Sequence, residues 1–285
     1  MEFFKKYWQE IILITLIFAN VSVWLAGSER KPSDKLKVYF FDIGQGDSVF
    51  IDSPTHGRVL IDGGPNRSVL SELGKVLPFY DKRIDVVIET HPDKDHIGGL
   101  PEVVKRFKVG AFLEPGVESE NSIDDELKSR LDERGIPQLL ARRGMTIDFG
   151  DGAKLYILFP NQDVSRWETN DASIIAKLVY GDKSFLFTGD APVKVENILM
   201  SMDSEIIDSD VLKVGHHGSR TSTSELFVER VSPEYGIISA GKDNSYGHPH
   251  EEVINNLNKF AVKILNTANL GTIAFETDGK ELIYK

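Results

Sequence analysis

The sequence predicts an α/β domain built as a four-layer αββα sandwich, preceded by an apolar N-terminal helix. Short segments of alternating apolar and polar residues, separated by turns, follow one another from about residue 37 onward. Segments with helical spacing then alternate with strands. This arrangement occurs in both halves of the 285 residues without repetition of the sequence itself. Two similar halves of this kind predict two sheets packed between two layers of helices.

The first 27 residues form a separate segment. Residues 11–27 run for 17 positions without a charge, at the short end of what spans a bilayer as a helix. Lys5 and Lys6 precede this run, so the positive-inside rule places the N-terminus in the cytoplasm and the remaining chain outside. A cleaved signal peptide and a buried core helix are the rival interpretations, but residues 24–26 make a poor cleavage site. We predict three parts: a single-pass membrane anchor (1–27), a linker (28–35) and a soluble domain (36–285).

The first half of the domain is predicted as a meander followed by alternating helices and strands. Its alternating runs KVYFFDIG, DSVFIDS and GRVLIDGG flank turns that contain glycine or proline. Helical spacing and buried-strand patterns come next. The expected elements are strands within 37–63, a helix at 68–80, a strand at 84–90, a loop entering a helix within 96–107, and a helix at 123–135.

The second half repeats this alternation. Residues 181–183, Gly-Asp-Lys, read as the turn of a hairpin between two strands. The expected strands are 145–150, 153–160, 173–180, 184–190, 211–215, 235–240, 262–266 and 272–277, and the expected helices are 191–202, 222–231 and 249–260.

Amino-acid composition excludes several kinds of binding surface and active site. A net charge of −11 and a pI near 5.2 argue against an extended basic surface that would hold nucleic acid by phosphate neutralisation alone. A polyanionic substrate would therefore need bound cations. The chain has no cysteine, which excludes disulfides, thiolate nucleophiles and Cys-ligated zinc.

Histidines and carboxylates gather where predicted strands end. Residues 90–99 read THPDKDHIGG, and six of the seven histidines fall in three short groups, each after a predicted strand. Such grouping favours a metal centre over a solvated acidic turn in which Asp93 or Asp95 caps a helix. Asp190, after another strand, is a candidate to bridge two cations, with a plain helix cap as the alternative. Asp42, Asp47 and Asp62 read equally as partners that orient ligating histidines or as local turn residues.

These motifs arrive in an order that resembles the metallo-β-lactamase fold. The motifs are H-x-D-x-D-H followed by Gly-Gly, N-D-x-S, F-T-G-D, K-V-x-H-H-G-S and G-H-P-H. Together with F-D-I-G-Q-G-D-S-V-F-I and V-L-I-D-G-G, they resemble in particular the branch represented by the C-terminal hydrolase domain of the DNA-uptake protein ComEC. The resemblance covers about residues 36–285 and implies a site at one edge between the sheets.

The resemblance assigns a role to each candidate residue. It implies a first metal on His91 and Asp93, a second metal on Asp95, His96 and His248, and Asp190 as the bridge. The family has a histidine where this chain has Asn170-Asp171, and either residue could fill that position. His216 is expected beside the scissile group as a proton donor or phosphate clamp. His217 and Ser219 would lie next to it, Asp95 is a further catalytic candidate, and His217 and His250 are read equally as packing residues.

The resemblance also implies a reaction. Two divalent cations would activate a water for hydrolysis, and the oxygen-rich donor set makes Mn²⁺ or Mg²⁺ plausible beside Zn²⁺. The expected substrate is DNA or another phosphodiester, and the ComEC setting adds a membrane location and a separate channel protein as a partner. Two alternatives remain: a hydrolase of the same fold acting on another ester, lactone, lactam or thioester, and a non-enzymatic binding module with a degenerate site.

Overall fold

A computed structural model describes residues 7–9, 11–18, 20–21, 35–202 and 205–285. The chain forms two compact units, Met1–Ser33 and Asp34–Lys285. In the first unit the described residues are helical, whereas residues 1–6, 10, 19 and 22–27 of the predicted anchor and 28–34 of the linker lie outside the described residues. Among the described residues, no helix combines the length and the apolar character that a membrane crossing needs. The anchor and the three boundaries remain predictions.

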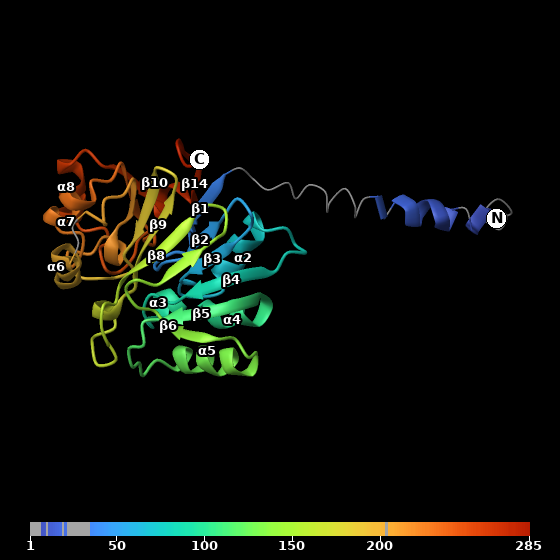
Figure 1. Ribbon diagram of the computed structural model, residues 1–285, viewed down its shortest axis with the longest axis horizontal. Helices are drawn as coiled ribbons and strands as arrows, with labels where there is room; N and C mark the ends of the chain where they lie inside the picture. Colours follow the sequence, from blue (N-terminus) through green and yellow to red (C-terminus); the bar gives the residue numbers. More distant parts are fainter. Residues whose placement is uncertain (1–6, 10, 19, 22–34, 203–204) are drawn as a thin grey trace. The chain divides into compact units, whose positions relative to one another are not determined.

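The second unit contains two mixed β-sheets, whose arrangement is visible in Figure 1. The first sheet has the order β15-β14-β1-β2-β3-β4-β5-β6. Its antiparallel β1–β2–β3 meander confirms the prediction for residues 37–63. The strands are β1 (Leu36–Phe40), β2 (Val49–Asp52), β3 (Arg58–Ile61), β4 (Arg83–Ile88), β5 (Lys108–Glu114), β6 (Gln138–Leu140), β14 (Ile273–Thr277) and β15 (Leu282–Tyr284).

The second sheet has the order β13-β12-β11-β10-β9-β8-β7. Tyr180 pairs with Lys183 across the predicted hairpin, and β10, β11, β12 and β13 run parallel. The strands are β7 (Thr146–Asp148), β8 (Lys154–Phe159), β9 (Ile175–Tyr180), β10 (Lys183–Phe187), β11 (Val211–Lys213), β12 (Tyr235–Ile238) and β13 (Lys263–Asn266).

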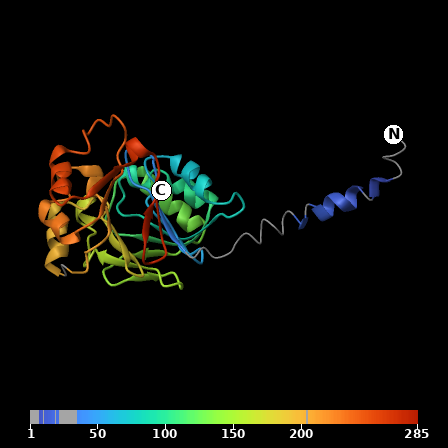
Figure 2. The same ribbon diagram turned by 90° about the horizontal axis from the view of Figure 1, so that it is seen from above.

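Helices cover the outer faces of both sheets, as Figures 1 and 2 show. Apolar side chains of both sheets form one core cluster between the layers, for example Phe40 against Phe187 and Phe275. Further clusters lie under the helices of each outer layer. The helices are α2 (Ser68–Val76), α3 (Lys94–Ile97), α4 (Leu100–Arg106), α5 (Ser122–Glu133), α6 (Val193–Met202), α7 (Glu225–Val231), α8 (Glu251–Lys259) and α9 (Thr267–Leu270), with 3-10 turns η1 (Asn170–Ala172) and η2 (Gly215–Gly218). All of these clusters lie within Asp34–Lys285, so this unit has a complete core of its own and is expected to fold by itself.

The structure confirms the predicted α/β fold of two sheets and corrects several elements. The helix predicted for 68–80 ends at Val76, because Leu77 precedes Pro78 and takes an extended conformation. The helix predicted within 96–107 is two helices, α3 and α4, separated by Gly98 and Gly99. Strands β5, β6 and β15 and helix α9 were not predicted from the sequence.

Candidate metal centre

The candidate residues meet at one edge of the sandwich, where strands of both sheets end. The 91–96 loop follows β4 in the first sheet. Asp190 follows β10, η2 follows β11, and His248 lies in the loop after β12, all in the second sheet. Since β10, β11 and β12 are parallel, their carboxyl ends lie at the same edge and deliver their loops to one place.

Four side chains form the centre of this edge: Asp95, His96, Asp190 and His217. Each offers one ligand atom, and these atoms all lie within 4.8 Å of one another. The Nε2 atom of His217 lies 3.1 Å from Asp95 Oδ2 and 3.5 Å from Asp190 Oδ2. The Nε2 atom of His96 lies 3.3 Å from Asp190 Oδ1. Two residues from each sheet thus converge on a volume that a cation could fill.

His91 extends the cluster on one side. Its ring lies 4.0 Å from that of His96, centroid to centroid, and its Nε2 atom lies 3.7 Å from Asp93 Oδ2. Asp93 and Asp95 are more open than the histidines, with side chains that are 41% and 36% exposed. The imidazoles of His91 and His96 are buried and the two carboxylates are partly exposed, so the site is open to solvent on the carboxylate side.

Unpartnered atoms test whether this cluster suits a metal ion. The Nε2 atoms of His91 and His96 and the Oδ1 atom of Asp190 are buried and have no hydrogen-bond partner. A buried polar atom without a partner costs free energy, and such atoms are rare in folded proteins. All three atoms are of ligand type and belong to one cluster, so the residues fit a cation. The His and Asp donor set accepts Zn²⁺ as well as harder ions such as Mn²⁺.

Buried side chains contact the Nδ1 atoms of His96 and His91, the ring nitrogens that are not directed at the cluster. Asp62 Oδ2 lies 2.8 Å from His96 Nδ1, and the same carboxylate accepts hydrogen bonds from the backbone N–H and hydroxyl of Thr90. The Thr90 hydroxyl also lies 3.1 Å from His91 Nδ1. A carboxylate that holds one imidazole nitrogen leaves the other nitrogen aimed at the metal. This geometry agrees with the orienting interpretation of Asp62.

His217 is held in the same manner from the opposite sheet. Its Nδ1 atom lies 3.1 Å from Asp47 Oδ1 and 3.0 Å from the carbonyl oxygen of Ser239. Asp47 is buried and also pairs with Lys213, whose Nζ atom is 2.8 Å away and which is 2% exposed. The Asp42 carboxylate accepts a hydrogen bond from Gly44 N, which agrees with the turn interpretation of this residue.

The backbone has unusual conformations or close contacts at two places beside the cluster, residues 216–217 and Gly46. His216 and His217 both have left-handed φ values, 48° and 54°, which are rare for residues other than glycine and concentrate at functional sites. Gly46 packs its Cα against the 91–96 loop, where an added Cβ would lie 2.1 Å from the carbonyl oxygen of Asp95. Only glycine permits this close approach.

Electrostatics at the centre favour positive charge. Burial opposes charge on His217, but the Asp190 and Asp47 carboxylates outweigh it and raise its pKa to about 9. Burial also opposes charge on His96, where Asp190 and Asp62 hold the pKa well above the usual value. Burial would raise the pKa of Asp190, but His217 and His96 hold it well below its usual range. Without metal the site therefore carries protons that a cation would replace.

The remaining histidines lie at the rim. His216 is 26% exposed, with Nε2 3.5 Å from Asp190 Oδ2 and Nδ1 3.0 Å from the Thr221 hydroxyl oxygen. The ring of His248 lies 5.7 Å from that of His216, and burial together with the neighbouring histidines lowers the pKa of His248 to about 4. His250 Nδ1 instead accepts a hydrogen bond from Arg220 N, which is a local structural contact.

The two residues at the position of the missing histidine differ. Asp171 forms an ion pair of 2.5 Å with Lys194. Asn170 places its Oδ1 atom in the interior without a hydrogen-bond partner. Both lie on η1, and Ser173, just after it, places its hydroxyl 3.4 Å from His91 Nδ1.

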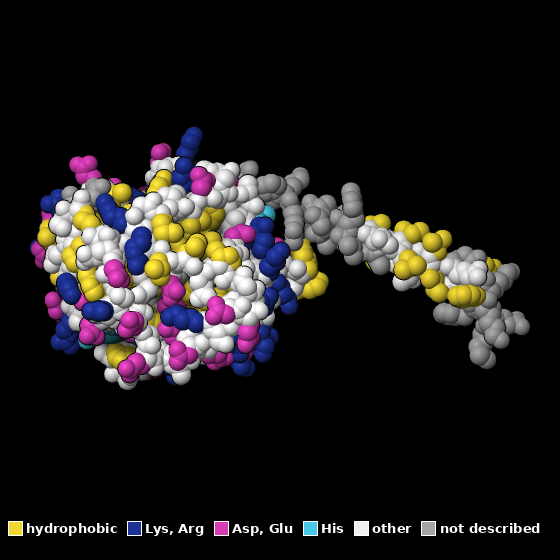
Figure 3. Space-filling view, turned by 60° about the horizontal axis from the view of Figure 1, so that its bottom comes forward, with side chains coloured by type: hydrophobic (Ala, Val, Ile, Leu, Met, Phe, Trp, Pro, Cys, Tyr) yellow, Lys and Arg dark blue, Asp and Glu magenta, His cyan; other side chains and the backbone are white. Residues whose placement is uncertain are grey.

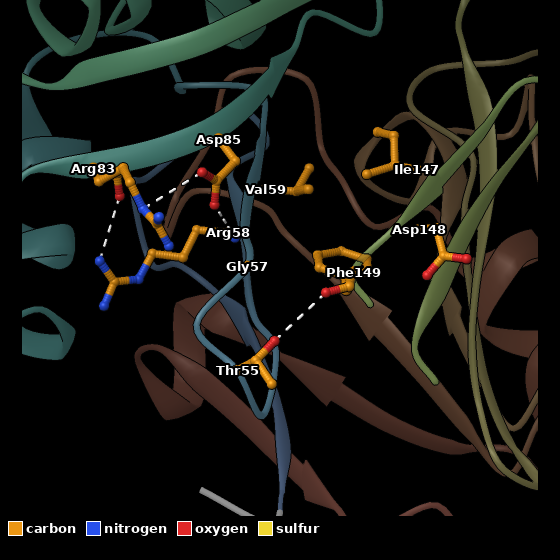
Figure 4. A pocket seen from close by; sticks show the side chains of 9 residues that line it. All are labelled: Thr55, Gly57, Arg58, Val59, Arg83, Asp85, Ile147, Asp148 and Phe149. Atoms are coloured by element: carbon orange, nitrogen blue, oxygen red, sulfur yellow. Dashed lines mark hydrogen bonds and ion pairs between the residues drawn. The ribbon is translucent and has the colours of Figure 1, made fainter. Parts of the chain in front are cut away.

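A cavity of about 280 Å³ lies at the other end of the sandwich, between the β2–β3 turn, β4 and β7 (Figure 4). Its charged side chains already have partners: Arg83 lies 3.4 Å from Asp85, and Arg58 pairs with Asp52 and Asp81. None of these lining residues carries a buried polar side-chain atom without a hydrogen bond, whereas His91, His96 and Asp190 do, and we place the site at those three residues.

Comparison with known proteins agrees with this site. Residues 41–242 match the model of the metallo-β-lactamase superfamily. The chain belongs to that superfamily. Its members are generally metal-dependent hydrolases, and this chain has the His and Asp cluster that can bind metal.

Several curated proteins are similar to this chain over most of its length. ComE operon protein 3 of Bacillus subtilis is 36% identical over 85% of this chain, and competence protein ComA of Neisseria gonorrhoeae is 30% identical over 87%. Recombination protein 2 of Haemophilus influenzae is 30% identical over 81%. The chain spans about a third of the length of these relatives, 33%, 33% and 28% respectively. The chain is thus ComEC-like in its hydrolase domain.

Solved structures share the fold. The metallo-β-lactamase fold protein YhfI of Bacillus subtilis aligns with a TM-score of 0.58 at 13% identity, covering 86% of this chain and all of YhfI. CmlA, a diiron β-hydroxylase of Streptomyces venezuelae, aligns with a TM-score of 0.53 at 13% identity, covering 90% of this chain and 55% of CmlA. At these identities the likeness establishes the architecture alone.

Proposed function

We propose that this chain is a membrane-anchored, two-metal phosphodiesterase that cleaves DNA. The observation that carries the proposal is the shared carboxylate of Asp190, which lies between the imidazoles of His96, His216 and His217 and has one buried oxygen without a hydrogen bond. Such a carboxylate suits a bridge between two cations. When bound, two divalent ions would supply an activated water and charge stabilisation for an attack on phosphorus.

The donors divide into two sets around Asp190. His91 and Asp93, with Asn170 or Asp171, would hold the first ion. Asp95 and His96, with His248, would hold the second, and His217 lies close enough to join them. The unpartnered oxygen of Asn170 favours this residue for the third place in the first set, since the Asp171 carboxylate already pairs with Lys194.

His216 is the proposed proton donor. It is partly exposed, whereas His96 and His217 are buried, and the Thr221 hydroxyl at Nδ1 keeps Nε2 directed toward Asp190. A proton on Nε2 can therefore be delivered to a leaving oxygen beside the metals. The names of two relatives, which refer to competence and recombination, support DNA as the substrate class.

The location is part of the proposal. Residues 1–27 would anchor the chain in the cell membrane, with the hydrolase domain on the extracytoplasmic side and a separate channel protein as partner. The uncharged run over 11–27 and the lysines before it support this topology. Extraction of cell membranes at alkaline pH tests it, since an anchored chain stays in the pellet. Protease added to intact spheroplasts should then digest the domain.

The activity is tested with the Asp34–Lys285 unit stripped of metal and resupplied with Mn²⁺, Zn²⁺ or Mg²⁺. We expect metal-dependent cleavage of single- or double-stranded DNA that Asp190→Asn abolishes. Asn170→Ala and Asp171→Ala form a matched pair, and the former should lower metal affinity more. If two ions bind but neither DNA nor a generic phosphodiester is cut, the nuclease proposal fails and ester, lactone and thioester substrates come next.

A further inference from the structure

The end of the sandwich opposite the metal centre carries an unusual surface. Strands β3, β4 and β5 begin at this end, whereas the ligand loops follow the ends of strands at the other. The chain also enters the unit here, because Lys37 at the start of β1 pairs with Asp52, and Asp52 pairs with Arg58 at the start of β3. This end is therefore the part of the unit nearest, along the chain, to the apolar run of residues 11–27.

Two adjacent aromatic side chains stand out from this end. They lie in the loop between α2 and β4, which protrudes from the sheet in Figure 1. Phe79 is 88% exposed, more than any other large hydrophobic side chain of the described residues, and Tyr80 is 47% exposed. Their rings contact each other edge to face at 5.2 Å. Phe79 lines a cavity of about 190 Å³ together with Leu70, Leu73 and Phe107.

Cationic side chains lie near the two rings. Lys82 and Arg106 line the same cavity, as does Asp81, and Lys108 N donates a hydrogen bond to Lys82 O, which places Lys108 beside them. These three side chains and that of Arg83 are exposed. Within the described part of the chain, Lys82 and Lys108 have no carboxylate at ion-pair distance. Figure 3 shows such a group of hydrophobic side chains with Lys and Arg beside it at the right-hand edge of the unit. In a chain of net charge −11 this local positive charge is a distinct feature.

We propose that this end, formed by Phe79, Tyr80, Lys82 and Lys108, docks on an anionic lipid surface. Phenylalanine and tyrosine rings bury their apolar parts at the boundary between headgroups and acyl chains, and nearby lysines and arginines pair with lipid phosphates. A lipid occupant is favoured over a protein because the chain enters the unit at this end, a short linker after the apolar run of residues 11–27; this choice of occupant rests on the membrane anchor of the proposed function. Docking would hold the metal centre on the side of the unit that faces away from the bilayer. The inference is independent of the hydrolase reaction.

The test measures binding of the Asp34–Lys285 unit to vesicles in a flotation assay, so that the N-terminal segment does not contribute. One vesicle preparation contains phosphatidylcholine alone and the other equal parts of phosphatidylcholine and phosphatidylglycerol. We expect binding to the anionic vesicles that weakens with added salt. The double variant Phe79→Ala, Tyr80→Ala should lower the partition coefficient at least about tenfold. Lys82→Glu with Lys108→Glu should have a similar effect through charge alone.

Matched controls come from elsewhere on the unit. Leu226→Ala removes an exposed apolar side chain of α7 that is 48% exposed, and Lys242→Glu reverses an exposed charge in the loop after β12, at the metal-centre edge. Both should bind as the parent does. Failure of the parent unit to float with anionic vesicles would overturn the proposal, as would equal losses in the control and docking-surface variants. Concentration-dependent dimerisation abolished by the aromatic double variant would also overturn it, by assigning the surface to a second copy.

Discussion

Replacement of Asp62 by asparagine separates the orienting role of this carboxylate from its contribution to the fold. Asp62 accepts hydrogen bonds from Thr90 N at 2.8 Å and Thr90 Oγ1 at 2.7 Å, and it lies 2.8 Å from His96 Nδ1. Asparagine keeps the shape but removes the charge that holds the His96 ring. Loss of such a partner lowers metal affinity by about 10- to 100-fold, or roughly 1.4–2.8 kcal/mol.

The chain offers a matched control. Asp210 likewise accepts the backbone N–H and hydroxyl of one residue, Ser184, at 2.8 and 3.2 Å and one cation, Lys183, at 3.0 Å, but lies at the start of β11, away from the ligands. Asp62→Asn and Asp210→Asn should each reduce the free energy of unfolding, by roughly 1–3 kcal/mol for loss of charged hydrogen bonds. In calorimetric titration with Mn²⁺ only Asp62→Asn should bind weakly.

The pH dependence sharpens this experiment. Asp62 raises the pKa of His96, so in the parent protein a proton competes with the metal. The difference between parent and Asp62→Asn should therefore be smaller in acid and grow as the pH rises past the pKa of His96. Equal metal affinities for Asp62→Asn and the parent at alkaline pH would refute the orienting role.

Two further predictions concern the same edge. Because the pKa of His217 is about 9 in the metal-free protein and the pKa of His96 is also raised, metal affinity should rise toward pH 9 by up to about tenfold per pH unit for each proton released. A titration that is flat between pH 7 and 9 contradicts this charge state. Gly46→Ala should displace the Asp95 carbonyl and reduce metal-dependent activity by about 100-fold. The control Gly74→Ala lies on α2, where an added Cβ meets no atom within 4 Å, and it should stabilise the protein by about 0.5–1 kcal/mol. Kinetic assays and thermal melts of the two variants check this, and comparable activities would show that the approach of Gly46 is unimportant.

The fold was largely predictable because its strands alternate clearly or form short apolar runs. The β5 strand escaped because Gly110 interrupts its alternation, and glycine is unfavourable within strands. In the structure a Cβ at this position would lie 2.6 Å from the backbone oxygen of Asp85, so close packing against β4 accounts for the glycine. Local pattern cannot reveal a contact of this kind, since it depends on the neighbouring strand.

The residues of the candidate site were predictable from the sequence, but the contacts between their side chains were not. Ligand loops could be placed because each follows a strand. The contact between Asp47 and His217 joins residues 170 positions apart, and nothing local specifies it. One signal was present: Lys213 lies in the apolar run Val211–Gly215, and a lysine buried in such a strand needs a carboxylate partner. That observation would have indicated a buried acid in contact with the end of β11.

The central four ligands come in pairs from the two sheets, Asp95 and His96 from one and Asp190 and His217 from the other. A bound ion would thus cross-link loops of the two sheets, and the protein would have to release the ion in order to unfold. At a free metal concentration 100 times the dissociation constant, such linkage stabilises a protein by about 2.7 kcal/mol. The lifetime of this protein would then depend on metal supply in its surroundings, and starvation for the ion would expose the opened sandwich to proteases.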